Sequence, residues 1–173
     1  MKKVIFQVFV SLIFLSCKEE ITVVPESKTD LLTKQKWNIY KYTIGTPNTP
    51  TRSISQLASE KNNGKYYADF SFAYSIYKKD GNLTVLNTSN ELVDYKWKFI
   101  NETQIETTRV QNGNSQIDDI IELSETRLVL KTTLKKGVTP NDRWNSVAAD
   151  LRSHGFGVGF TEVYIIEEFT AER

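Results

Sequence analysis

Residues 66–78 read YYADFSFAYSIYK, and residues 79–82, which follow directly, read KDGN. Apolar and aromatic side chains recur at every second position of the longer stretch. One face carries Tyr66, Ala68, Phe70, Phe72, Tyr74 and Ile76, and the other carries Tyr67, Asp69, Ser71, Ala73, Ser75 and Tyr77. A period of two over this length predicts a strand with one buried face. Gly81 tolerates the positive φ of a tight turn, so we expect a hairpin here.

Shorter alternating segments lie on both sides of this hairpin. The predicted strands are residues 37–44, 66–78, 83–87, 92–100, 104–110, 117–123, 127–134 and 159–169. Turns of a few residues join most of them, and the long polar segment 46–65 is expected to be a loop. Short strands with short links favour an all-β, eight-stranded antiparallel up-and-down barrel, which is wide enough for side chains or one small ligand.

One segment near the C-terminus departs from this period. Thr139 is a candidate N-cap, and Pro140 suits the first position of a helix. An apolar stripe follows at helical spacing, formed by Trp144, Val147, Ala148 and Leu151, and Gly155 is expected to end the helix. This inserted helix is expected to cover the outer face of the last strand or to close one end of the barrel.

The first sixteen residues differ from the rest of the chain. Lys2 and Lys3 precede an apolar run over residues 4–15, which is typical of a secretory signal. The run is shorter than the roughly 20 apolar residues of a membrane-spanning helix. We therefore expect a signal peptide over residues 1–16, a tether over 17–30 and a barrel domain over 31–173. Asp30 is the expected N-cap of a short helical turn at the junction.

Cys17, the only cysteine, stands at the expected cleavage point. Phe14-Leu15-Ser16-Cys17 resembles the lipobox of bacterial lipoproteins, and this resemblance implies that Cys17 is lipidated with acyl chains such as palmitate. Lys18-Glu19-Glu20 resembles the lipoprotein export signal of one phylum of Gram-negative bacteria. It implies a lipid anchor in the outer membrane, at the cell surface. The alternatives are an ordinary signal peptide with an incidental cysteine, and a solvated charge cluster on a tether.

The chain from Leu31 to Phe169 also resembles the lipocalin-like domains of bacterial lipoproteins. The matching pieces are Leu31-Leu32 before Trp37, the hairpin Lys79-Asp80-Gly81-Asn82-Leu83-Thr84, Tyr95-Lys96-Trp97-Lys98-Phe99, and Ile121-Glu122-Leu123-Ser124 leading to Arg127-Leu128-Val129-Leu130-Lys131. The resemblance implies an eight-stranded barrel with a pocket in some members. It implies a fold more than a function.

Charge and composition exclude several classes of function. The chain has 22 Lys and Arg against 21 Asp and Glu, and no basic run stands out, so we expect no nucleic-acid partner. His154 is the only histidine. With Cys17 modified, the sequence offers neither a Cys–His pair nor a histidine set for zinc. We therefore expect no catalytic residue, no metal, no cofactor and no enzymatic activity.

The candidate pocket residues lie on the expected inner faces of the strands. They are Phe70, Phe72, Tyr74, Tyr95, Trp97, Phe99, Asp119, Leu128 and Leu130. The aromatic members form either a filled core or the lining of a cavity. Asp119 shares a face with Ile117, Ile121 and Leu123, and it is either a solvated strand end or a polar contact inside a pocket.

Two functions remain open at this point. In the first, the barrel binds a small hydrophobic molecule or a glycan fragment. In the second, a filled barrel docks on an outer-membrane protein partner through the loop 46–65. An internal cavity of about 300 Å³ or more with convergent polar groups would favour the first function.

Overall fold

A computed structural model describes residues 26–53, 72–87, 89–153 and 155–172 of the chain. The strands are β1 (Lys36–Thr46), β2 (Thr49–Ser53), β3 (Tyr74–Tyr77), β4 (Asn82–Leu86), β5 (Leu92–Asn101), β6 (Gln104–Arg109), β7 (Ser115–Leu123), β8 (Arg127–Lys135) and β9 (Glu162–Glu172). The helices are α1 (Lys28–Thr33) and α3 (Asn141–Ser153). Neither helix in these ranges is long and apolar enough to cross a lipid bilayer.

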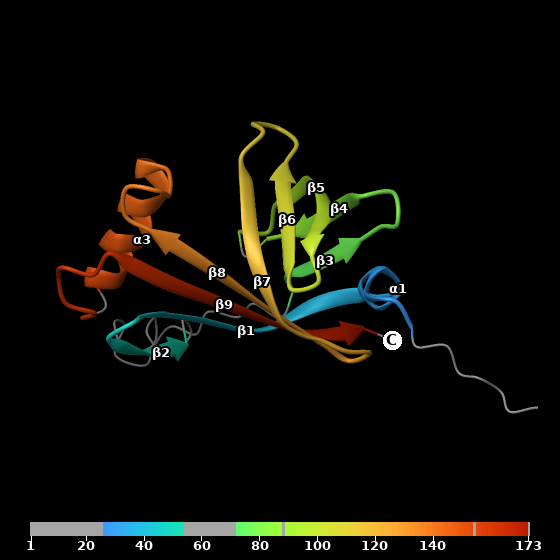
Figure 1. The fold of residues 1–173 in the computed structure, drawn as a ribbon, viewed down its shortest axis with the longest axis horizontal. Coiled ribbons are helices and arrows are strands. Elements are labelled where there is room, and N and C mark those ends of the chain that lie inside the picture. Colours follow the sequence, from blue (N-terminus) through green and yellow to red (C-terminus); the bar gives the residue numbers. More distant parts are fainter. Residues whose placement is uncertain (1–25, 54–71, 88, 154, 173) are drawn as a thin grey trace, which may run out of the picture.

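Eight of these strands form a closed antiparallel barrel (Figure 1). Each strand from β3 to β9 pairs with the next, and β1 closes the ring by pairing with both β3 and β9. The hairpin predicted at KDGN joins β3 to β4, with Tyr77 opposite Leu83 and Gly81 at φ 79°. The predicted all-β, up-and-down, eight-stranded barrel with a helix near the C-terminus is confirmed.

A further strand lies within the segment that was expected to be a loop. β2 pairs with the end of β1, with Thr43 opposite Ser53, and it lies outside the ring as an edge strand. An edge position suits Pro50, because proline has no N–H to donate to a neighbouring strand. The expectation of a loop is therefore wrong for residues 49–53. Residues 54–65 of that loop, and residues 66–71 of the next predicted strand, lie outside the described ranges.

Apolar side chains fill the end of the barrel beside α1. Leu32 and Trp37 are 1% and 0% exposed, and the Trp37 indole N–H donates to the Leu32 carbonyl at 2.9 Å. Because α1 contacts β3 and β7, which are on opposite sides of the ring, the helix closes this end. The N-cap of α1 is Ser27, whose hydroxyl accepts the Asp30 N–H at 3.1 Å. The expectation that Asp30 caps this helix is wrong, since it lies in the first turn.

The second helix, α3, packs on β1, β8 and β9 at the ends of these strands that lie away from α1 (Figure 1). Its buried residues, Trp144, Ala148 and Leu151, form one cluster with Ile44 of β1, Leu134 of β8, and Val163 and Ile165 of β9. Alternation along β9 puts Val163 and Ile165 on the same face as Phe169, which lines the interior. The helix therefore lies on the concave side, at the barrel end away from α1, and not on the outer face of β9. Gly155, at φ 79°, follows the end of the helix, as predicted.

Candidate functional site

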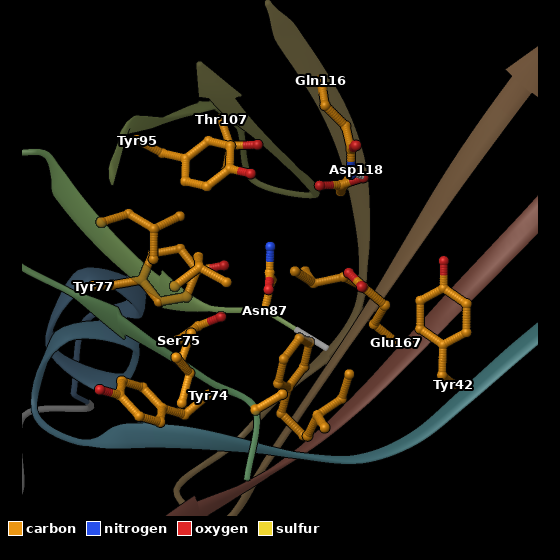
Figure 2. Close-up of a pocket in the computed structure, with 17 residues that line it drawn as sticks. Tyr42, Tyr74, Ser75, Tyr77, Asn87, Tyr95, Thr107, Gln116, Asp118 and Glu167 are labelled. Atoms are coloured by element: carbon orange, nitrogen blue, oxygen red, sulfur yellow. Dashed lines mark hydrogen bonds between the residues drawn. The ribbon is translucent and has the colours of Figure 1, made fainter. Parts of the chain in front are cut away.

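The barrel contains a cavity of about 390 Å³ that is open to the outside on one side. Its apolar lining includes Leu83 and Val85 of β4, Leu130 of β8 and Phe169 of β9. Its polar lining residues are labelled in Figure 2. Space remains here because two small residues face inward at the start of β3 and directly before it: Ser75 and Ala73 are 5% and 3% exposed, and both line the cavity.

Tyrosines and carboxyl groups face each other across this cavity. In a ring of eight strands, β3 lies opposite β7, and β5 lies opposite β9. Tyr77 of β3 and Tyr95 of β5 therefore lie across from Asp118 of β7 and Glu167 of β9. Figure 2 shows the two tyrosines on one side of the space and the two acids on the other.

Asp118 is held by hydrogen bonds from its neighbours. Its Oδ1 accepts from the Thr132 hydroxyl at 2.5 Å and from the Gln116 amide at 2.6 Å, and the side chain as a whole is buried. The same Gln116 amide nitrogen also donates to Thr132 at 2.9 Å. Burial raises the pKa of Asp118, and the hydrogen bonds from Thr132 and Gln116 offset only part of that effect. Asp118 thus has one carboxyl oxygen, Oδ1, that already accepts two hydrogen bonds.

A charged residue of α3 continues this network. The Arg143 guanidinium donates to the Gln116 side-chain oxygen at 2.5 Å. Gln116 accepts from the cation with one end of its amide and donates to Asp118 with the other. The hydrogen bonds therefore join α3 to the interior of the barrel, and they bring one positive charge close to Asp118.

Glu167 differs from Asp118 in its contacts. It makes no hydrogen bond or ion pair with any residue in the described ranges, and its side chain points into the cavity (Figure 2). Burial, followed by repulsion from Asp118, raises the pKa of Glu167 to about 7, and the positive charge of Arg143 opposes this rise. The residue as a whole is partly exposed, and it lines the cavity. At neutral pH this group is therefore close to half ionised.

The tyrosines supply hydrogen-bond donors to the same space. Burial, with smaller contributions from Asp118 and Glu167, raises the pKa of the Tyr77 phenol. The phenol therefore stays protonated at physiological pH and is able to donate. The Tyr77 ring meets the Trp97 ring edge to face, with centroids 5.5 Å apart, and this contact fixes its position.

The structure divides the candidate residues from the sequence between the cavity and the core. Tyr95 and Leu130 line the cavity. Trp97, Phe99 and Leu128 pack in the apolar cluster around Trp37, where the Trp97 indole N–H donates to the Lys78 carbonyl at 2.9 Å. Those three residues belong to the apolar core beside the site and do not border the cavity.

The placements of Phe72 and Asp119 need correction, that of Tyr74 holds for the residue but not for its ring, and one candidate lies outside the described residues. Phe72 is 41% exposed, on the outer side of its segment. Tyr74 borders the cavity, but its ring points away from it (Figure 2) and lies under the Lys36 ammonium group. Asp119 points outward and accepts from the Gln104 amide at 2.9 Å. Phe70 belongs to the segment that is not described.

A single bulge explains the error at Asp119. β7 shifts register between Ile120 and Glu122. Leu123, beyond the bulge, packs on the core, and counting back from it by twos would place Asp119 inside. The bulge inserts a residue and inverts the alternation, so Asp118 lies inside instead.

Sequence reasoning also missed Glu167. The alternation of Val163, Ile165 and Phe169 marks one apolar face of the last strand, and Glu167 is the polar interruption of that face. A charged residue in an otherwise buried row was therefore the signal available in the sequence. Two cavity tyrosines were also not selected from the sequence: Tyr77 of β3, and Tyr42, which lies on β1 next to β9.

Comparison with protein-family models and with curated protein sequences finds no match to this chain. Within the described ranges, no group of three or more His, Cys, Asp or Glu side chains is placed to hold a metal ion.

Proposed function

We propose that this protein is a lipid-anchored, lipocalin-like binding protein whose barrel holds one small, partly apolar molecule. The cavity of about 390 Å³ carries this proposal. It falls within the range of about 300–1,000 Å³ that is typical of small-molecule sites, and it combines apolar walls with a few convergent polar groups. The alternative function, docking by a filled barrel, does not account for this cavity.

The proposed anchor rests on the sequence. Cys17 would carry the lipid, and the residues between it and Ser27 would link the membrane to the cap of α1. Stable anchoring needs more than one acyl chain, which a lipoprotein supplies. The barrel would then sample molecules at the outer-membrane surface without being released.

Native mass spectrometry of the protein purified from its own host tests the binding function. We expect an added mass that disappears on denaturation, unlike the covalent lipid. Val85→Phe, which enlarges a cavity-lining side chain on β4, should remove this added mass. Thr84→Phe is the matched control, because its neighbouring position faces outward, where the Thr84 hydroxyl contacts Asp94.

Two results would count against the proposal. One is the unmodified mass for the unaltered protein, which would mean that nothing is retained. The other is equal retention by Val85→Phe and Thr84→Phe, which would place the bound molecule outside the cavity.

A further inference from the structure

The charged residues described in the cavity lining are all acidic. Of the residues described, those that line the cavity include two carboxyl groups, Asp118 and Glu167, and no Lys, Arg or His. The cation whose charge acts on Glu167, Arg143, is already engaged through Gln116 on the Asp118 side. The carboxyl group of Glu167 therefore faces the cavity without a partner among the described residues. A buried carboxylate is costly unless it is paired.

We propose that the ligand is a small organic amine, whose ammonium group pairs with Glu167 beside Asp118 and whose apolar body lies against the tyrosines opposite. This inference rests on the proposed binding function and specifies its ligand class. An ammonium group supplies the donors that a carboxylate accepts, and it removes the cost of the unpaired charge.

The wall opposite Glu167 fits the remainder of such a molecule. Tyr77 and Tyr95 present aromatic surface from β3 and β5, and Leu83 and Val85 add apolar surface from β4. Aromatic faces also attract cations, so these rings favour a positively charged ligand over a neutral one of the same shape. An anionic ligand would meet two carboxyl groups and is disfavoured.

The groups that face Glu167 fix the expected pH dependence. They are Asp118 on β7, Arg143 on α3, and the cavity phenols Tyr42, Tyr77 and Tyr95. An ammonium ion binds the ionised form of Glu167, whose pKa in the empty barrel is about 7. Binding near pH 7 should therefore release a proton, and affinity should fall as the pH decreases below that value.

The test compares three probes of matched shape: 2-phenylethylamine, 2-phenylethanol and 3-phenylpropanoate. NMR titration at pH 8 gives their affinities, and calorimetry in buffers of different ionisation enthalpy gives the protons released. We expect the amine to bind about tenfold or more tightly than the alcohol, and the acid to bind most weakly. Only the amine should release a proton near pH 7.

Two variants of neighbouring residues separate the cavity from the surface. Glu167→Gln keeps the size of the side chain but removes the charge, so it should abolish the preference for the amine over the alcohol. Glu168→Gln should leave that preference unchanged, because Glu168 lies on the outer face of β9 and pairs with Arg127 and Lys41.

Each outcome bears on a separate statement. If the alcohol binds as tightly as the amine, or if Glu167→Gln retains the preference, the amine inference is overturned while the binding function stands. If none of the three probes shifts the resonances of cavity residues, the amine inference is overturned, and the proposed binding function is overturned only if native mass spectrometry also finds no retained mass.

Discussion

Glu167→Gln should stabilise the protein at neutral pH, and the size of the effect follows from the burial of this carboxyl group. Burial and Asp118 raise the pKa of Glu167 from its ordinary 4.5 to about 7. Each pKa unit corresponds to about 1.4 kcal/mol, so ionised Glu167 costs the empty barrel about 3 kcal/mol. Glutamine has the same shape without the charge, so the variant avoids that cost.

The pH window follows from the same two pKa values. Below about 4.5, Glu167 is protonated in both the folded and the unfolded protein, and it has little effect on the free energy of unfolding. Between 4.5 and about 7 the unfolded chain loses its proton first, so stability falls as the pH rises. Above about 7 the cost is complete. The advantage of Glu167→Gln should therefore grow from near zero at pH 4 to about 3 kcal/mol at pH 8.

Urea unfolding at a series of pH values, followed by tryptophan fluorescence, measures this difference directly. Glu168→Gln is the control on the same strand. Burial alone would raise the pKa of Glu168, but hydrogen bonds from Arg127 and Lys41 lower it, so this variant should destabilise the protein at neutral pH. The reasoning would be refuted if the difference between Glu167→Gln and the unaltered protein did not change with pH, or if that variant were the less stable of the two at pH 8.

Three further predictions concern the turn, the second helix and the anchor. Gly81→Ala places a Cβ at φ 79° in the β3–β4 turn and should cost about 1 kcal/mol or more in urea unfolding; an unchanged midpoint would contradict the assigned turn. Trp144→Ala empties the buried centre of the contact between α3 and the strands and should cost about 3–5 kcal/mol, with faster amide exchange in α3 than in the barrel; uniform exchange would argue against a separate cluster. Cys17→Ser should move the protein from the membrane fraction to the soluble fraction, and retention in the membrane would rule out a lipid on that residue.

The sequence alone determined the class and the connections of the fold. Period-two alternation and the KDGN turn are local properties, because side-chain direction and turn geometry depend on a few neighbouring residues. The apolar stripe of α3 was readable for the same reason. These signals predicted all eight strands of the ring and the helix near the C-terminus, although β2 was missed inside a segment rich in Pro and Thr.

Only the tertiary structure decided which face of each strand looks inward. At β3 the sequence pattern pointed to the wrong face: the face of Phe72 and Tyr74 was expected to look inward, but Phe72 is exposed, and the alternate face of Ala73, Ser75 and Tyr77 is buried and lines the cavity. On β7 the bulge after Ile120 placed Asp118, not Asp119, in the cavity. A shift of one residue moves a side chain to the opposite face, and the pattern of one strand does not contain that shift.

The candidate site itself depends on contacts between distant parts of the chain. Asp118 and Glu167 come from strands that are not neighbours in the ring, and Arg143 reaches this site from α3. Each residue is an ordinary charged side chain in its own segment. Closure of the barrel brings the two carboxyl groups into one cavity. Burial there raises both pKa values, repulsion from Asp118 adds to the rise at Glu167, and this effect exists only in the folded chain.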